Sequence, residues 1–358
     1  MNSKAKKIII SVVAVVSAII LIVVSYLLYI VISYHRIEDM QPLRVNGSSS
    51  VTAPVGESLS LVTYNVGFGA YSTDYSFFMD GGEHSRAYSK EAVLSNINGA
   101  VDAVESVNPD FVLLQEVDTD GTRSYHVNQR DIFAAAIKSG EWIFGENYDS
   151  PYFFYPFNEP IGANKSGIMT LSKYNISSAV RCSLPIEESL YKYLDLDRAY
   201  TVSAIPTENG KQLMLYNVHL SAYTSDGTIA DEQMKMLSAD MQAEYEKGNF
   251  VVAAGDFNKD MLGDSSKYFK RCEGDEFTWA QPFKQSLLPE GFCSYSGENA
   301  ATCRNADSAF RGDGTDFVLS VDGAIVSGNV RVNLCETVDT GFAYSDHNPV
   351  KLEFILAN

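Results

Sequence analysis

The chain has 358 residues, 46 % of them hydrophobic, and carries 45 acidic against 27 basic side chains, a formal net charge of −18. This length is sufficient for a large buried core, and the acidic balance opposes general binding to the phosphate backbone of nucleic acids. Nucleic acid is not excluded as a substrate, because a local cationic site or a bound divalent metal can reverse the potential at one place.

The chain begins with an uncharged apolar run, residues 8–32, preceded by Lys4, Lys6 and Lys7. As a helix this run would be about 37 Å long, enough to cross a hydrocarbon core of about 30 Å with some tilt. The lysines before it predict that residues 1–7 stay in the cytoplasm and that the remainder lies outside. A cleaved signal peptide is the alternative, but its apolar region would be about 7–15 residues and would end at a small-residue cleavage site. The run therefore predicts a single-pass signal anchor in the cell membrane.

Residues 33–56 are polar, rich in turn-forming residues and without periodicity, so we expect a linker. Residues 57–358 contain regular apolar runs, no second linker and no internal repeat, which indicates one folded domain. The five cysteines show no metal-binding spacing. Cys293 and Cys303 are the nearest pair, and an oxidising exterior would permit a bridge between them, although free buried thiols are equally compatible with the sequence.

Apolar runs that end in polar clusters predict strands along this domain, with amphipathic helices between some of them. The predicted strands are residues 58–69, 110–117, 165–174, 199–206, 212–223, 249–258, 316–327 and 347–356, and the predicted helices are residues 89–110 and 228–248. Many apolar strands with few covering helices favour an α/β fold of two packed, mainly antiparallel sheets flanked by helices.

Residue types that bind metals or move protons stand at or just beyond the ends of six apolar runs. They are Asn65, Glu116, His219, Asp256 with Asn258, Asp322, and Asp346 with His347. Each alone is compatible with a turn, an exposed acid or a satisfied core side chain. Because strand side chains alternate, Asp256 and Asn258 should share a face while Phe257 turns to the core.

Asp256, Asn258 and Asp260 also match the first alternate positions of a calcium-binding loop. The sixth position is Met261 where a glycine is needed, and the twelfth is Lys267 where a bidentate glutamate is needed. The preceding residues moreover read as a buried strand rather than as a helix. We therefore expect Asp260 to belong to a turn.

Taken in order, these motifs resemble the endonuclease/exonuclease/phosphatase superfamily, which includes pancreatic-type deoxyribonucleases, neutral sphingomyelinases and inositol-polyphosphate phosphatases. The matching pieces are TYNVG, LLQEV, SGIMTLSKY, NVHLSAY, AGDFN, VDGAIVS and SDHNPV, which together extend over nearly all of residues 58–356. GDFN and SDHNP are the most specific of them. The resemblance implies a four-layer α/β sandwich and makes residues 57–358 a catalytic domain.

For the metal, the resemblance implies that Glu116 is the principal ligand of a Mg²⁺ or Mn²⁺ ion, with Asn65 beside it. Asp346 would support either this metal site or the general acid. Carboxylate and amide oxygens are the donors that such hard cations prefer.

For the chemistry, the resemblance implies that Asp256 orients or deprotonates the attacking water and that Asn258 holds a phosphate oxygen. His347 would bind the phosphate, with Asp322 fixing its tautomer. His219 would contact phosphate or donate a proton to the leaving group.

Two further segments are candidates for substrate contact. Residues 69–90 are a polar and aromatic insertion beside the predicted metal site and contain His84 and Arg86; a decorative surface loop is the alternative. Residues 150–160 are an aromatic cluster that could be a half-covered core strand or could enter lipid headgroups. Lys165 lies where relatives often contact phosphate, but a surface lysine would look the same.

The sequence thus predicts a metal-dependent phosphoesterase on the outer side of the membrane. The anchor and the aromatic segments favour a phosphate ester that is lipid-linked or on the cell surface. The alternatives are a membrane-tethered extracellular nuclease resembling deoxyribonuclease I, and a non-catalytic binding or scaffold protein on the same fold. No obligate protein partner is predicted. No GxSxG, GxxxxGK[ST] or GxGxxG motif supports a competing chemistry.

Overall fold

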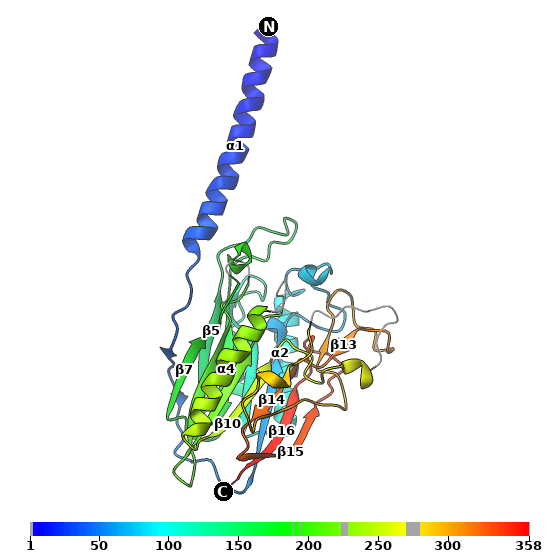
Figure 1. Cartoon of the computed structure of the whole chain (residues 1–358). Helices are drawn as coiled ribbons and strands as arrows, with labels where there is room; N and C mark the ends of the chain where they lie inside the picture. Colours follow the sequence, from blue (N-terminus) through cyan, green and yellow to red (C-terminus); the bar gives the residue numbers. More distant parts are fainter. Residues whose placement is uncertain (1–2, 188, 194, 223–227, 270–279, 358) are drawn as a thin grey trace.

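The computed structural model describes residues 3–187, 189–193, 195–222, 228–269 and 280–357 (Figure 1). Its first element is helix α1 (Ser3–Ser33), which projects away from the rest of the molecule with no buried residue. This helix contains the whole apolar run 8–32 and is long and apolar enough to span a membrane.

Two seven-stranded sheets form the body of the molecule. One has the order β1-β7-β8-β9-β10-β14-β11, and the other has the order β15-β16-β3-β4-β6-β5-β2. Each contains one parallel pair, β9–β10 in the first sheet and β3–β4 in the second, and its other neighbours are antiparallel. The fold expected from the sequence, two packed and mainly antiparallel sheets flanked by helices, is confirmed.

The elements have the following bounds. The strands of the first sheet are β1 (Gln41–Pro42), β7 (Ser178–Ser183), β8 (Ala199–Pro206), β9 (Gln212–His219), β10 (Phe250–Asp256), β14 (Asp322–Val326) and β11 (Cys293–Tyr295). Those of the second are β15 (Val330–Thr337), β16 (Val350–Leu356), β3 (Ser58–Asn65), β4 (Phe111–Gly121), β6 (Asn164–Ser172), β5 (Glu141–Asp149) and β2 (Asn46–Gly47). A separate pair is β12 (Cys303–Arg304) with β13 (Val318–Leu319). The α-helices after α1 are α2 (Lys90–Val107), α3 (Gln129–Ala136) and α4 (Thr228–Glu246), and the 3₁₀ helices are η1 (Gly67–Gly69), η2 (Phe78–Asp80), η3 (Leu190–Tyr193), η4 (Ser265–Lys267) and η5 (Gln285–Leu287).

The apolar side chains form three layers of packing. In β10, Val252 and Ala254 face the core between the sheets, whereas Val251 and Ala253 pack under α4. The second sheet is covered in the same way by α2 and α3, with Leu114 on its outer face. The result is the four-layer order helices, sheet, sheet, helix, which the alternation of strand side chains requires when both faces of each sheet are buried.

Part of the predicted linker, residues 33–56, pairs with the edges of the two sheets. β1 adds to the edge of the first sheet at β7, and β2 adds to the edge of the second at β5. Ala53 is fully buried and its N–H donates to the carbonyl of Pro206. Parts of the predicted linker, within residues 41–53, therefore pack against the domain, and strands this short derive their hydrogen bonds from partners that the local sequence does not reveal.

Three local predictions are settled by the structure. Residues 150–160 do not form a strand; their only ladder contact in the described chain is an isolated bridge between Phe153 and Gly162. Asp260 forms a turn, accepting hydrogen bonds from the backbone N–H groups of Leu262 and Ser265. The cysteines within the described ranges are free thiols, including Cys293 and Cys303, whereas Cys272 lies outside those ranges.

Candidate active site

The site lies at one end of the first sheet, where the first or last residues of neighbouring strands form a row. Ser183 pairs with Ala199, Ala199 with His219, His219 with Asp256, and Asp256 with Asp322. His219 and Asp256 follow the inward-facing apolar residues of their strands at intervals of two, and Asp322 precedes those of β14 at the same interval, so all three continue the face that looks toward the second sheet. All three side chains are buried.

Close packing between strands explains the glycine of the GDFN motif, Gly255. A Cβ atom on Gly255 would lie 2.0 Å from the carbonyl oxygen of Val218 on the parallel strand β9. No other residue permits this approach, which brings Asp256 beside His219.

The second sheet contributes Asn65 and Glu116 by different routes. Asn65 is the last residue of β3 and lies on the inner face. Glu116 is an extra residue in β4, between Leu114 and Val117, where the register with β6 shifts, and its φ is +55°. This bulge turns the Glu116 carboxylate away from the helix-covered face and toward Asn65.

Asn65 connects the two sheets through its amide. Its Nδ2 donates to Glu116 Oε1 at 3.3 Å and to Asp256 Oδ2 at 3.1 Å, while its Oδ1 accepts the N–H of Gly67 at 3.0 Å. His219 Nε2 lies 3.9 Å from Glu116 Oε1 and 3.7 Å from Asp256 Oδ2. The predicted residues from the two sheets therefore share one site.

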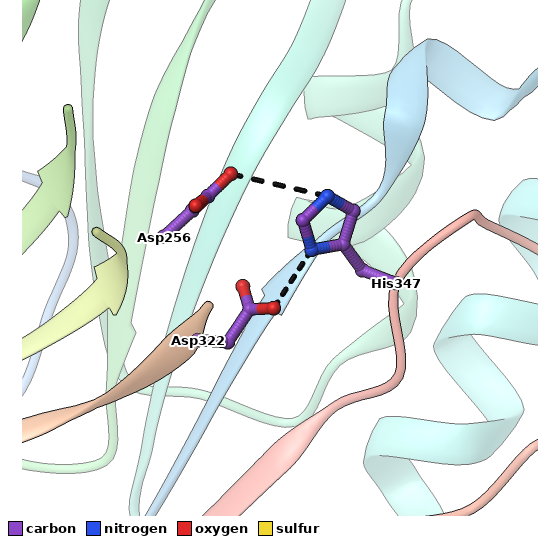
Figure 2. Close-up of side chains that lie close together, drawn as sticks. All are labelled: Asp256, Asp322 and His347. Atoms are coloured by element: carbon purple, nitrogen blue, oxygen red, sulfur yellow. Dashed lines mark hydrogen bonds and ion pairs between the residues drawn. The ribbon is translucent and has the colours of Figure 1, made fainter. Parts of the chain in front are cut away.

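His347 completes the row from the loop before β16 (Figure 2). Its Nδ1 is 2.7 Å from Asp322 Oδ2, and its Nε2 is 3.9 Å from Asp256 Oδ2. Cys303 Sγ lies 3.7 Å from the same Nε2. The short contact with Asp322 fixes the imidazole so that Nε2 points toward Asp256 (Figure 2).

Burial and neighbouring charges shift the titration of these groups in opposite directions. Burial, with the nearby Asp322 carboxylate, raises the pKa of Asp256 to about 7. Burial alone would lower the pKa of His347, but Asp322 and Cys303 outweigh it and hold that pKa well above the ordinary value. Burial, reinforced by Arg198, lowers the pKa of His219 well below its usual range. At neutral pH the site therefore contains a protonated and a neutral imidazole beside a carboxyl group near its midpoint.

Asn258 lies just past the end of β10 in a turn, not on the strand itself. Its φ is +49°, its backbone N–H donates to Asp256 Oδ1 at 2.9 Å, and its Nδ2 donates to the carbonyl of Leu220 at 2.8 Å. Phe257 points into the core under α4, as expected. The turn thus holds Asp256 and Asn258 together by a hydrogen bond rather than by strand alternation.

The predicted metal ligands have suitable chemistry. Burial raises the pKa of Glu116, which the charge of Asp346 raises further and that of Arg123 opposes. The Glu116 side chain keeps 22 % of its surface exposed, so a cation could reach it. Two carboxylates and the free lone pair of the Asn65 amide oxygen are the hard oxygen donors that a divalent cation prefers, and a bound cation would relieve the repulsion between them. The residues therefore fit a divalent metal.

A second group in the described chain also has metal-binding geometry. One ligand atom from each of Asp256, Asp322 and His347 lies within 4.8 Å of the others. The hydrogen bond between Asp322 and His347 already pairs two members of this group.

The three predicted substrate-binding residues have other contacts. Lys165 Nζ pairs with Asp149 Oδ2 at 3.0 Å, Arg86 donates to the carbonyl of Pro160, and His84 packs against the rings of Tyr75 and Tyr88. None of the contacts found among the described residues joins them to the site. Their binding of substrate stays a prediction.

Two arginines near the site were missed by sequence reasoning. Arg123 forms a buried pair with Asp118 at 2.8 Å, lies 3.9 Å above the ring of Phe68 and opposes the rise in the pKa of Glu116. Arg198 donates to the carbonyl of Leu220 at 2.8 Å and lowers the pKa of His219. Arg123 lies in the turn after β4 and Arg198 directly before β8, and only their burial distinguishes them from surface arginines.

A buried polar network underlies the site. Asn217 Oδ1 accepts from Gln115 Nε2 at 2.7 Å, and Asn217 Nδ2 donates to the carbonyl of Met169 at 2.9 Å. These bonds cross from one sheet to the other: Gln115 pairs with Asn65 in the second sheet, and Asn217 lies two residues before His219 in the first. The sequence could have indicated this network, because Asn217 occupies an inward position in the apolar pattern of residues 212–219.

Comparison with known proteins agrees with this geometry. A model of the endonuclease/exonuclease/phosphatase family matches residues 62–347. An endonuclease/exonuclease/phosphatase protein from Beutenbergia cavernae DSM 12333 has a TM-score of 0.56 at 16 % identity, with 84 % of this chain and 72 % of that chain covered. ANGEL2, a 2′,3′-cyclic phosphatase in complex with adenosine-2′,3′-vanadate, has a TM-score of 0.53 at 14 % identity, with 87 % and 98 % covered. D. rerio TDP2 complexed with a single-strand DNA product has a TM-score of 0.50 at 16 % identity, with 83 % and 99 % covered.

The structural likenesses are at low identity and show the fold alone, and no curated protein matches the sequence. The family model, however, extends over most of the chain and contains every residue of the row. The chain therefore belongs to the endonuclease/exonuclease/phosphatase family and is a metal-dependent hydrolase of phosphate ester bonds.

Proposed function

We propose that the chain is a Mg²⁺- or Mn²⁺-dependent phosphoesterase, displayed on the outer side of the membrane, that directs water at a phosphodiester or phosphomonoester. Its preferred substrate is a lipid-linked or cell-surface phosphate ester. The observation that carries the proposal is the convergence of Glu116 and Asn65 from one sheet with Asp256 at the facing end of the other, beside His347 from the loop before β16.

Glu116, Asn65 and Asp346 would hold the metal, for the reasons of donor chemistry given above. When bound, the ion would draw charge from the phosphate and stabilise the departing oxygen.

Asp256 would orient the attacking water and accept its proton. A base is most effective when its pKa is near the working pH, and burial brings that of Asp256 to about 7. The hydrogen bond from the Asn258 backbone and that from Asn65 fix the two carboxylate oxygens. Asn258 itself would hold a phosphate oxygen.

The two histidines would act as donors of different kinds. His347, held protonated by Asp322, would bind the charged phosphate oxygens through Nε2. His219 is neutral at pH 7 and would donate one N–H to phosphate or to the leaving group.

The location rests on the N-terminal segment. α1 is long and apolar enough to cross a bilayer, and three lysines precede the apolar run. By the distribution of positive charge, residues 1–7 would be cytoplasmic and the catalytic domain extracellular.

A membrane-tethered nuclease is the second candidate, and one structural neighbour was solved with a DNA product. The net charge of −18 weighs against it, because binding to nucleic acid gains most of its affinity from cationic contacts with phosphate. A non-catalytic scaffold is the third candidate, but a scaffold has no need for the intact row of acid, amide and imidazole groups.

The test uses the full chain in phosphatidylcholine nanodiscs. It should hydrolyse an aryl phosphodiester or an aryl phosphate with Mg²⁺ or Mn²⁺, and EDTA or His347→Ala should reduce the rate by about 10²-fold or more. Plasmid DNA, RNA, sphingomyelin and phosphoinositides are then compared side by side. Nicking of DNA at low salt without lipid turnover would establish the nuclease instead, and no metal-dependent turnover on the whole panel would favour the scaffold.

A further inference from the structure

Aromatic side chains gather on the surface beside the membrane helix. The loop between β5 and β6 contributes Tyr152, Phe154, Tyr155 and Phe157, and η2 contributes Phe78 together with the apolar Met79. We name these six residues the aromatic shoulder. Phe157 is 85 % exposed, Tyr155 63 % and Phe154 51 %. The rings of Tyr155 and Phe157 lie 6.0 Å apart, and Phe78 contacts Tyr155 at 5.9 Å. A contiguous apolar group this exposed indicates a contact surface.

The shoulder is joined to α1. Tyr26 Oη donates to the carbonyl of Tyr152 at 3.3 Å and accepts the N–H of Phe154 at 3.2 Å. Tyr29 Oη accepts the N–H of Tyr152 at 3.0 Å, and the rings of Tyr26 and Phe154 meet at 5.4 Å.

These contacts fix the height of the shoulder along the helix. Tyr26 precedes the end of α1 at Ser33 by seven residues, which is about 10 Å along the axis. The loop therefore reaches beside the last two turns of a helix that is apolar up to Ile32. Tyrosines at the end of a membrane span belong to the headgroup region, where aromatic rings with a polar group are most stable.

The shoulder and the active site lie at the same end of the molecule. Just after α1, Arg36 donates to the carbonyl of Leu184, and Asp39 Oδ1 accepts the N–H of Ser183 at 2.7 Å. Ser183 stands in the same row as Asp256, three strands away, which is about 14 Å at ordinary strand spacing. Figure 1 shows α1 leaving from this end, opposite the C-terminus.

We propose that the aromatic shoulder enters the headgroup region of the membrane that α1 crosses and holds the active site against the bilayer surface. The substrate would then be the phosphate ester of a lipid headgroup in that same membrane; this part rests on the proposed function, whereas the membrane contact does not.

The chemistry of the shoulder identifies the kind of lipid. Residues 150–163 contain one charged side chain, Glu159, which is bound to Ser85. No lysine or arginine is present in this segment to attract anionic lipid. The contact therefore rests on apolar and dipolar interactions with zwitterionic headgroups and is insensitive to salt.

The contact is tested by fluorescence of the full chain in phosphatidylcholine nanodiscs that contain lipid with a nitroxide on its headgroup. Phe157→Trp places a fluorescent tryptophan on the shoulder, and Tyr268→Trp places one at an exposed aromatic position after η4. The unmodified chain gives the background fluorescence of the two native tryptophans. The added fluorescence at 157 should fall by about half or more at low and at high salt, and that at 268 should stay nearly unchanged. Equal quenching at the two positions would overturn the proposal.

The consequence for substrate is tested with Phe154→Ser, Tyr155→Ser and Phe157→Ser combined, against Tyr268→Ser as the matched control. Turnover of a lipid phosphate ester in the disc should fall about tenfold because the site loses its position, while turnover of a soluble aryl phosphodiester stays unchanged. An equal fall on both substrates would contradict the role of the shoulder. Quenching at 157 without any hydrolysis would defeat the proposed function alone, and hydrolysis without quenching would defeat the membrane contact alone.

Discussion

The two sheets contribute to the site in different ways. The sheet that contains β9, β10 and β14 presents His219, Asp256 and Asp322 from the regular inner face of three neighbouring strands. The other sheet presents Asn65 from a regular position but Glu116 from a bulge with φ of +55°.

The two halves of the site, one with Glu116 and one with Asp256, therefore carry different kinds of unfavourable free energy. The half with Glu116 holds backbone strain, of the order of 1–3 kcal/mol for a residue in the left-handed region. The half with Asp256 contains buried ionisable groups, and the pKa values of Asp256 and His347 are both raised there. We therefore expect one half to respond to metal and the other to respond to pH.

The largest expected effect is from Asp256→Asn. The amide cannot accept the proton of the attacking water, so kcat/KM should fall by about 10²–10⁴-fold, measured on an aryl phosphodiester at saturating metal. Adding more metal should not restore the rate. Restoration by metal would place Asp256 among the ligands and remove the distinction between the halves.

Glu116→Gln should act through the metal instead. Loss of a carboxylate ligand should weaken binding of Mn²⁺ by at least about tenfold, measured by calorimetry, and high metal concentration should recover part of the rate. Glu336→Gln, on the distant edge strand β15, is the control and should leave metal affinity unchanged. Unaltered affinity in Glu116→Gln would show that the metal is held elsewhere.

Asp322→Asn should shift the pH dependence. The carboxylate keeps the pKa of His347 high, so its removal lowers that pKa and His347 loses its proton at lower pH. The alkaline limb of kcat/KM should therefore move to lower pH, with a smaller loss of activity at pH 6 than at pH 8. A profile that falls uniformly at all pH values would assign Asp322 a purely structural role.

The smallest expected effect concerns stability without metal. The folded state binds a proton at Asp256 more tightly than the unfolded chain does, so its contribution to stability falls as pH rises from about 4 to about 7. In EDTA, Asp256→Asn should raise Tm by about 2 °C or more at pH 8, and this gain should shrink toward pH 4. A gain that is independent of pH would mean that packing, not charge, is responsible.

The fold was largely predictable because burial imposes a pattern on the sequence. Residues 199–206 coincide with β8, and α2 and α4 occupy the predicted helical segments. β7 and β15 were not predicted: SAVRCS has no clear alternation, whereas VRVNL at the start of β15 does alternate and was missed. Strands of two residues carry no local pattern at all.

The site was predictable only in part from the residues themselves. Regular alternation is sufficient to bring Asp256 and His219 to the inner face. The same alternation would place Glu116 on the helix-covered face with Leu114, because the sequence LLQEV gives no sign of a bulge. Only the family resemblance placed Glu116 in the site. Arg123 and Arg198 became visible only once their burial was known.

The short strands β1 and β2 have a consequence for solubility. An exposed sheet edge is a template on which another chain can add a strand. β1 ends at Pro42, which has no N–H to donate, and β2 consists of Asn46 and Gly47 alone, so neither can recruit a further strand. A chain shortened to begin at Val51 would uncover the edges of β7 and β5 together, and we expect it to self-associate in size-exclusion chromatography, whereas a chain that begins at Ile37 would remain a monomer.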